Sequence, residues 1–132
     1  MKDEILNIVS KFTLYDPDDR LLYLEKENIA IISYSKHGFT EAKRRLGPHF
    51  DMNYVPKKET AYLLNIYLPV EMRGQGYGQE LYTISENIAK KLGAVYLEQT
   101  PSGFIKCTNE SRRDYLLRRG YVSCGAFVRK CL

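Results

Sequence analysis

The sequence is poor in the residues that define several large protein classes. It has no tryptophan, only two histidines and only three cysteines. The cysteines (Cys107, Cys124 and Cys131) show no paired spacing, so they argue against a disulfide scaffold and are typical of free thiols in a reducing compartment. No grouping of histidines and cysteines has the spacing of metal ligands, and we therefore expect no metal.

Long hydrophobic runs are also missing. There is no stretch of eighteen apolar residues, and residues 1–4 lack the apolar core of a signal peptide. We therefore expect a cytoplasmic protein with no membrane association. The 132 residues, 44% hydrophobic and 27% charged, are sufficient for one domain over residues 1–132 with a real core. The net charge of +4 suits an anionic ligand without specifying one.

The first part of the chain has the pattern of a helix followed by a hairpin. Apolar residues recur at helical spacing over residues 3–12, and β-rich runs follow at 21–25 and 29–34. The basic segment 37–59 is less regular. Thr40 is a candidate cap for a short helix ending at Leu46, and we expect the whole segment to be a surface excursion.

A strand, a glycine-rich loop, a helix and a second strand occupy the middle of the chain. Residues 60–68 and 94–97 are apolar at nearly every position, which is typical of strands covered on both faces. Residues 79–92 between them have a helical apolar face. This order predicts two parallel strands joined by a right-handed crossover. We therefore predict an α/β (α+β) domain with a mixed, mostly antiparallel sheet, a central parallel pair and flanking helices.

The last part of the chain predicts one more helix and a final β segment. Asn109 is a candidate cap for a helix that runs to Arg119 and stops at Gly120. Residues 121–132 are short for two strands. We expect one strand kinked at Gly125, with a strand from a second copy completing the sheet in a homodimer.

The glycine-rich loop has the composition of an anion-binding site. Residues 73–78 contain three of the nine glycines, and such a loop before a helix lets backbone N–H groups converge on a phosphate. A dinucleotide fingerprint is excluded because Gln79 stands where it needs glycine, and the Gly-Lys-Ser/Thr of a nucleotide P-loop is absent. The pattern Arg/Gln-x-x-Gly-x-Gly/Ala is met by Arg73, Gly76 and Gly78. The alternative is a tight turn with no ligand.

With its flanks, this loop resembles the signature of a known family. Leu68-Pro69-Val70-Glu71-Met72-Arg73-Gly74-Gln75-Gly76-Tyr77-Gly78 looks like the acetyl-CoA signature of the GNAT N-acetyltransferase superfamily. Asn109 followed by Gly120-Tyr121 is similar to that family's second landmark, so the resemblance covers residues 61–121. It implies a GNAT-like fold whose central strands splay around acetyl-CoA, and transfer of the acetyl group by direct attack of an amine of a small molecule or protein.

The resemblance also implies roles for individual residues. The backbone of residues 73–78 would hold the pyrophosphate of CoA, residues 69–72 would pair with pantetheine, and Asn109 would contact the cofactor arm. The expected cofactor contacts are Leu68, Pro69, Val70, Met72, Arg73, Gly74, Gln75, Gly76, Tyr77, Gly78 and Asn109.

Two catalytic groups are expected beside the cofactor. Glu98 follows the second apolar strand, at the end where ligands of open α/β sheets lie, and it is the first candidate for the general base; Glu71 and Glu59 are the others. In the family a tyrosine four residues before the Gly-aromatic pair commonly acts as the acid, but Leu116 stands there. Tyr115, about 100° around the helix, is the candidate acid, and Cys107 is a substitute.

Two other functions stay open. Arg112, Arg113, Arg118 and Arg119 suggest a basic nucleic-acid-binding helix, but they scatter around the helix axis, so nucleic acid is disfavoured as a partner. The displaced tyrosine also allows a GNAT-like protein that binds CoA without catalysis. His37 and His49 are expected on the surface. The acceptor amine is not readable, although the basic residues between 37 and 58 favour one that carries a carboxylate.

Overall fold

The computed structural model describes residues 1–37, 47–101, 104–105 and 110–132. The segment expected to form a helix from Thr40 to Leu46 and the residues Cys107 and Asn109 lie outside these ranges. In chain order the elements are α1 (Lys2–Val9), β1 (Arg20–Lys26), β2 (Ile29–Ser35), β3 (His49–Val55), the 3-10 turn η1 (Pro56–Lys58), β4 (Thr60–Tyr67), the 3-10 turn η2 (Val70–Met72), α3 (Tyr77–Leu92), β5 (Tyr96–Gln99), β6 (Phe104–Ile105), β7 (Glu110–Ser111), α4 (Arg112–Arg118), β8 (Val122–Cys124) and β9 (Phe127–Cys131).

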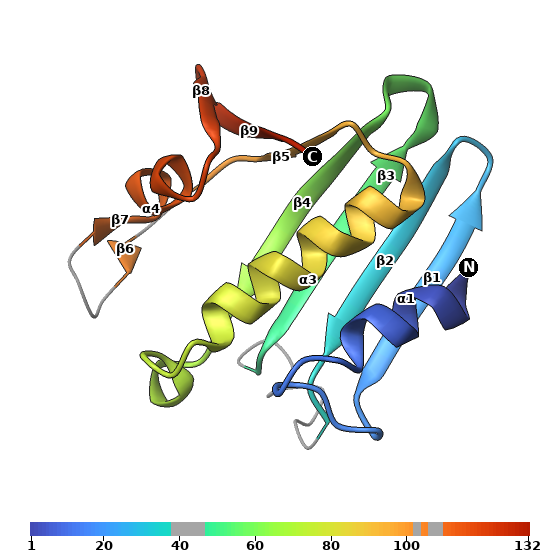
Figure 1. Cartoon of the computed structure of the whole chain (residues 1–132), viewed down its shortest axis with the longest axis horizontal. Helices are drawn as coiled ribbons and strands as arrows, with labels where there is room; N and C mark the ends of the chain where they lie inside the picture. Colours follow the sequence, from blue (N-terminus) through green and yellow to red (C-terminus); the bar gives the residue numbers. More distant parts are fainter. Residues whose placement is uncertain (38–46, 102–103, 106–109) are drawn as a thin grey trace.

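Seven of the strands form one sheet with the order β1-β2-β3-β4-β5-β9-β8 (Figure 1). Only the pair β4–β5 is parallel, and every other neighbouring pair is antiparallel. The helix α3 makes the crossover between the parallel strands. The predicted mixed sheet with a central parallel pair and flanking helices is therefore confirmed, as is the hairpin formed by β1 and β2.

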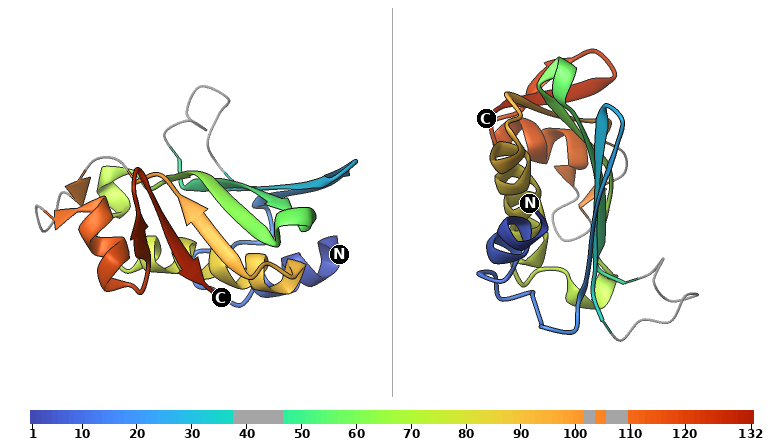
Figure 2. Two further views of the ribbon diagram at one scale, coloured as in Figure 1. Left: turned by 90° about the horizontal axis from the view of Figure 1, so that it is seen from above. Right: turned by 90° about the vertical axis from the view of Figure 1, so that its right-hand side faces the viewer.

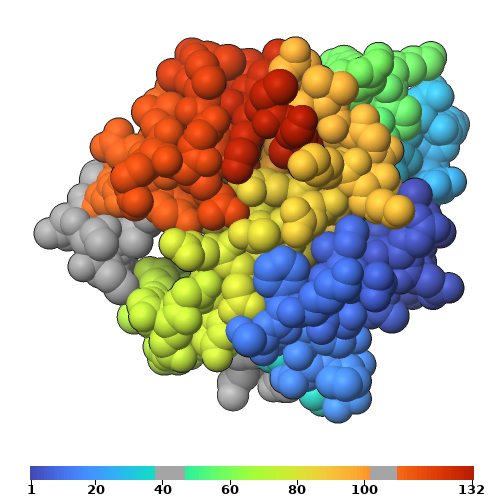
Figure 3. Space-filling view, in the orientation of Figure 1, coloured from blue at the N-terminus to red at the C-terminus, as the bar shows by residue number. Residues whose placement is uncertain are grey.

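The core lies between the sheet and the helices α1 and α3, which cover the same face (Figure 2, right-hand view). Alternate side chains of β2 and β3 point to this side, because successive residues of a strand face opposite ways. In the space-filling view α1 packs directly against α3 (Figure 3). Each large side chain buried there contributes roughly 1.5–3 kcal/mol. Those with no exposed surface include Ile32, Tyr34, Phe50, Met52, Leu81, Ile84 and Ile88.

The prediction that residues 37–59 form a surface excursion is wrong for the second half of that segment. Residues 49–55 form β3, which pairs with β2 on one side and β4 on the other. Phe50, Met52 and Tyr54 alternate with polar residues and are all buried. This period of two is the pattern of a half-buried strand, and the basic residues around it concealed the signal.

The prediction of a single C-terminal strand kinked at Gly125 is also wrong. The segment forms a hairpin in which β8 and β9 pair on either side of Gly125, with Cys124 opposite Phe127. Strand β9 in turn pairs with β5. The chain itself thus supplies the strand that a second copy was expected to bring, and the sheet gives no reason to expect a homodimer.

The helices begin or end at slightly different residues from those predicted. Helix α1 ends at Val9, whereas the apolar pattern continues to Phe12. Helix α3 begins at Tyr77, inside the glycine-rich loop. Helix α4 is capped by Ser111, whose Oγ accepts a hydrogen bond from the Asp114 backbone N–H at 3.0 Å. Among the described residues, no helix is both long and apolar enough to cross a membrane.

Candidate functional site

The two parallel strands separate soon after they begin to pair. Their ladder joins only residues Thr60 to Tyr62 of β4 with Tyr96 to Glu98 of β5. Strand β4 then continues to Tyr67, while the chain after β5 turns away toward α4 (Figure 1). The backbone of β4 beyond Tyr62 therefore has an edge that β5 does not pair. The residues predicted to contact a cofactor follow directly at the end of this edge.

The exposed part of β4 also differs from the sequence-based expectation of a strand covered on both faces. Ala61 and Leu63 are buried, but Leu64 is 61% exposed and Asn65 is also exposed. The register against β3 shifts between Asp51 and Met52, so β4 carries a bulge at Leu64. A bulge bends a strand and re-aims its side chains, and here it coincides with the separation of β4 from β5.

The loop after β4 is held by hydrogen bonds between its own residues, one from a side chain and one from the backbone. Arg73 Nε donates a hydrogen bond to the Leu68 carbonyl oxygen at 2.9 Å, and the Met72 backbone N–H donates to the Pro69 carbonyl at 3.0 Å. These bonds close residues 68–73 into a compact turn that contains η2. The guanidinium of Arg73 thus braces the loop through its Nε.

Gly76 and Gly78 differ in whether the fold itself requires a glycine at that position. Gly76 has φ +87° and is the residue that precedes the first turn of α3, a left-handed conformation that other residues adopt at a cost. Gly78 lies within α3 with no such φ, and a Cβ built on it meets no atom within 4 Å. The protein fold therefore does not require glycine at position 78, whereas a ligand approaching the backbone closely would.

The start of α3 presents free backbone donors to this open space. The first N–H groups of any helix lack partners within it, and among the described residues no side chain caps α3. The sixteen-residue helix adds the positive end of its dipole. Glu80 in the first turn is occupied elsewhere, because its carboxylate accepts hydrogen bonds from Thr13 Oγ1 at 2.6 Å and from the Leu14 N–H at 3.2 Å. An anion fits best at residues 74–79.

Glu98, the first candidate for the base, lies where the ladder between the parallel strands ends. Its side chain is mostly buried, and its Oε1 accepts a hydrogen bond from Arg129 Nε at 2.8 Å. The Arg129 guanidinium also lies over the ring of Tyr96, 4.3 Å from its centroid. Glu98 is therefore near the expected place but forms an ion pair that competes with a role as base. Glu71 and Glu59 are both exposed.

Helix α4 places Leu116 and Tyr115 in different surroundings. Leu116 is fully buried in the core, so no polar group stands in the position where the family commonly has tyrosine. The Tyr115 ring packs against the ring of Tyr82, with centroids 5.6 Å apart, and the Arg118 guanidinium lies 5.4 Å from its centroid. Tyr115 is thus held on the side of α4 that faces α3.

The sequence marks Arg112 as one of four arginines of a basic helix, one of which could reach the 3′-phosphate of CoA. The structure places Arg112 beside the exposed edge of β4. Its Nη1 donates to the Tyr82 hydroxyl oxygen at 3.2 Å and to the Ile66 carbonyl oxygen at 3.5 Å. Burial raises the pKa of Tyr82, and the nearby Arg112 guanidinium opposes that rise. Across the described residues, the only buried side-chain polar atoms without a partner are Arg112 Nε and Gln99 Nε2. Gln99 is the last residue of β5, one residue beyond the parallel ladder, and Arg112 contacts Ile66 on the part of β4 that β5 does not pair.

A second polar group missed by sequence reasoning lies on the opposite face of β4. His49 Nδ1 is 2.7 Å from the Gly47 carbonyl oxygen and its Nε2 is 3.0 Å from Asn65 Nδ2. The His49 ring also lies 5.7 Å from the ring of Tyr67. His49 was predicted to be an isolated surface residue, and only the pairing of β3 with β4 reveals these partners.

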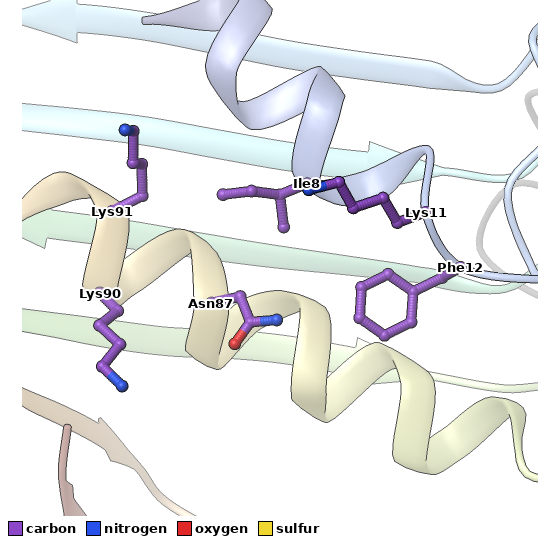
Figure 4. Close-up of a pocket in the computed structure, with 6 residues that line it drawn as sticks. All are labelled: Ile8, Lys11, Phe12, Asn87, Lys90 and Lys91. Carbon is purple, nitrogen blue, oxygen red and sulfur yellow. The ribbon is translucent and has the colours of Figure 1, made fainter.

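A shallow hollow of about 480 Å³ lies on the outer side of α1 and α3 (Figure 4). Its lining comes from the end of α1, the residues that follow it and the second half of α3, so it is separate from the glycine-rich loop at the start of α3. The residues that line it are Ile8, Lys11, Phe12, Asn87, Lys90 and Lys91. Within the described parts of the chain, no group of histidine, cysteine or acidic residues has the arrangement of a metal site.

Comparison with known proteins agrees with this architecture. The sequence model described as "Acetyltransferase (GNAT) family" matches residues 4–121. No curated protein matches the chain. Among solved structures, an acetyltransferase from Bacillus cereus ATCC 14579 has a TM-score of 0.59 and 15% identity, over 99% of this chain and 88% of that one.

Two further solved structures have the same fold. The IAA acetyltransferase from Bacillus cereus ATCC 14579 has a TM-score of 0.56 and 12% identity, over 80% of this chain and 79% of that one. The PaiA N-acetyltransferase from Thermoplasma acidophilum, solved in complex with coenzyme A, has a TM-score of 0.50 and 17% identity, over 80% of this chain and 62% of that one.

Proposed function

Because the chain belongs to the acetyltransferase (GNAT) family, we propose that it transfers the acetyl group of acetyl-CoA to an amine. The observation that carries the proposal is Gly78, a helical glycine that its own fold does not need, because a Cβ at this position would meet no atom of the described residues within 4 Å. A helical glycine lowers stability relative to alanine. A closely bound phosphate at the start of α3 supplies a reason for keeping it.

The predicted cofactor residues fit an extended ligand in which an arm leads to a pyrophosphate, as it does in CoA. Backbone N–H groups of residues 74–79 would hold the pyrophosphate. The pantetheine arm would run back over residues 68–72 to the unpaired edge of β4, where backbone groups are free to bond its amides. Of the predicted contacts, only Asn109 lies outside the described residues, and its contact with the arm stays a prediction.

Acetyl-CoA supplies a thioester whose carbonyl carbon an amine can attack directly. A lysine-type amine has a pKa of about 10.4, so only about one in 2,500 is neutral at pH 7, and a base must remove its proton. Glu98 stays the predicted base, although its ion pair with Arg129 competes with that role. Tyr115 stays the predicted acid. Backbone N–H groups on the free edge of β4 are suited to stabilise the oxyanion.

Calorimetry with acetyl-CoA and a matched pair of variants tests the cofactor site. Gly78→Glu places a carboxylate in the open space at the start of α3, where acidic residues are well tolerated by a helix, so we expect binding to be lost and folding retained. Asn87→Glu adds the same charge to an exposed position farther along α3 and should bind normally. If the unmodified protein does not bind acetyl-CoA, or if Gly78→Glu binds it equally well, the proposal fails.

A CoA-binding protein without catalysis is a second candidate, favoured by Leu116 in the place of the usual tyrosine. The two functions differ in the release of free CoA thiol when acetyl-CoA is offered with a panel of amines, including amines that carry a carboxylate. Amine-dependent thiol release that falls in Glu98→Gln or Tyr115→Phe supports transfer and the assigned residue. Tight binding with no thiol release above the spontaneous rate supports the second candidate.

A further inference from the structure

Arg112 brings a positive charge beside Ile66, on the part of β4 that lies beyond its separation from β5. Its Nη1 contacts are with neutral oxygens, the Tyr82 hydroxyl and the Ile66 carbonyl, and its Nε is buried with no partner. All the ion pairs between described residues involve other cations. Arg112 is partly buried, and a cation that is partly removed from water without a counter-ion is favoured by a further anionic partner.

The other arginines of this helical segment all have strong hydrogen-bond or ion-pair partners within the chain. Arg113 donates to Ser123 Oγ and, at 2.7 Å, to the Gly125 carbonyl. Arg118 pairs with Glu110 and Arg119 pairs with Glu86, each at 3.0 Å. Because these three guanidinium groups already have partners within the chain, they do not form a free basic stripe for nucleic acid, and Arg112 is distinct among them.

The position of Arg112 along β4 indicates which part of CoA it would meet. The proposed function places the pyrophosphate of CoA at residues 74–79 and its pantetheine arm over residues 68–72. The arm therefore runs back along the chain toward Ile66, and its thioester end is the part that comes closest to Ile66. Arg112 also precedes Leu116 by one helical turn, which places both on the same side of α4. Leu116 occupies the position from which, in the resembling family, a tyrosine commonly serves the sulfur.

We propose that Arg112 stabilises the CoA thiolate as it leaves, in the place of a proton donor; this inference rests on the proposed function and replaces the role of acid that Tyr115 was predicted to have. The amine nitrogen forms a bond to the carbonyl carbon, its proton passes to the base or to water, and the C–S bond breaks with its electron pair on sulfur. Arg112 donates charge-assisted hydrogen bonds to that sulfur and transfers no proton, because a guanidinium stays protonated in proteins. The thiolate takes a proton later from water.

Proton release on binding tests this role without knowledge of the acceptor. A cation beside a thiol lowers its pKa, so part of the bound CoA thiol would ionise and release its proton near neutral pH. Calorimetry in two buffers of different ionisation enthalpy measures the protons released. CoA should therefore release more protons than acetyl-CoA, which has no free thiol but the same phosphates.

Three variants give the inference its controls. Arg112→Gln should abolish the excess proton release while still binding acetyl-CoA, which also shows that it is folded, and Arg112→Lys should keep part of the excess. Arg113→Gln removes the same charge at the next residue and should keep all of the excess proton release.

If the excess proton release is absent from the unmodified protein, or persists in Arg112→Gln, the inference is overturned but the proposed function is not. Equal weakening of CoA and acetyl-CoA in Arg112→Gln would make the arginine a phosphate ligand and also overturn it. If neither ligand binds the unmodified protein, the proposed function fails as well.

Discussion

At the scale of single residues, Gly76 and Gly78 are glycines for opposite reasons. Gly76 serves the fold, because its φ of +87° lets the chain enter α3 from the loop. Gly78 has an ordinary helical backbone and open space where a Cβ would be. Stability and ligand binding should therefore respond differently to the same change at these two positions.

Replacing each of these glycines by alanine separates the two reasons. Gly76→Ala should lower the free energy of unfolding by about 1–2 kcal/mol, because alanine is strained in the left-handed region. Gly78→Ala should raise it by about 0.4–1 kcal/mol, because alanine loses less backbone entropy in a helix. Urea unfolding without ligand measures both values. Calorimetry should show weaker acetyl-CoA binding in Gly78→Ala despite its higher stability, and unchanged affinity there would remove the argument for a close ligand.

Asp19 is a second residue whose surroundings predict a measurable effect. Its side chain has no exposed surface, and it accepts hydrogen bonds from the Tyr34 hydroxyl, from Lys36 Nζ at 3.2 Å and from the His37 N–H at 3.0 Å. Burial alone would raise the pKa of Asp19, but these donors outweigh it and the pKa is lowered. Folding therefore favours the ionised carboxylate.

The lowered pKa sets the direction of the pH dependence. A group whose pKa is lower in the folded state stabilises the protein above its unfolded pKa, about 3.9 for aspartate, and this contribution is lost as the pH falls through the folded value. Asp19→Asn should therefore cost about 2 kcal/mol at pH 7, and its difference from the unmodified protein should shrink below about pH 4. Urea unfolding across this pH range provides the measurement. The exposed neighbour Asp18 is the control, and Asp18→Asn should change little; a cost for Asp19→Asn that does not depend on pH would contradict the assignment.

At the scale of secondary-structure elements, one buried carboxylate ties the C-terminal part of the chain to α3. Glu86 lies on α3 and is 8% exposed. Its two oxygens accept hydrogen bonds from Arg119 Nε and Nη2, both at 3.0 Å, from the Tyr121 hydroxyl at 2.9 Å and from Lys130 Nζ at 3.2 Å. The end of α4 and strand β9 therefore meet at this single side chain.

Removing this charge should loosen the packing of α4 and β9 on α3. Glu86→Gln keeps the shape but leaves two cations without their carboxylate, and we expect it to lower the free energy of unfolding by about 3 kcal/mol. Glu4→Gln breaks the Glu4–Lys91 pair, in which both side chains are about half exposed, and should change it by less than about 1 kcal/mol. Thermal and urea unfolding compare the two. Equal effects would show that the Glu86 network contributes no more than a surface pair.

At the scale of the whole molecule, the sheet has two parts that meet at a short parallel ladder. Strands β1 to β4 form one part and β5, β9 and β8 form the other, and only three residue pairs join β4 to β5. Helix α3 connects the two parts in sequence. A ligand placed between the separating strands would contact both parts, so its binding should stabilise the whole domain.

Thermal unfolding with and without CoA measures this coupling. At a CoA concentration one hundred times its Kd, binding to the folded state alone adds about 2.7 kcal/mol, which raises the Tm of a chain of this length by about 10 °C. Gly78→Glu should show no such rise in Tm at the same CoA concentration.

A nucleic-acid-binding protein would instead be stabilised by DNA, with an effect that falls steeply between about 50 and 200 mM salt. Stabilisation by DNA without stabilisation by CoA would contradict the proposal that the chain binds acetyl-CoA.

Local patterns were sufficient for the parts of the fold whose signal lies within a few residues. The hairpin of β1 and β2, the helix α3 and the parallel strands were predicted because apolar periodicity and glycine positions are properties of short windows. The same windows located residues 68–78 as one loop at the end of a central strand. Strand β3 was missed although its alternation is visible, because its basic flanks were given more weight than Phe50, Met52 and Tyr54.

The partners of Arg112, Glu98 and His49 could not be read in the same way. Arg112 reaches Tyr82, thirty residues earlier, and Glu98 reaches Arg129, thirty-one residues later. His49 meets Asn65 only because β3 and β4 pair in one particular register. Backbone conformation and burial periodicity follow from neighbouring residues, so the amino-acid order was enough for the glycine-rich loop and the family it resembles. Which charges are paired and which are left free depends on distant segments meeting in space, so the unpaired guanidinium at the strand separation emerged only from the folded arrangement.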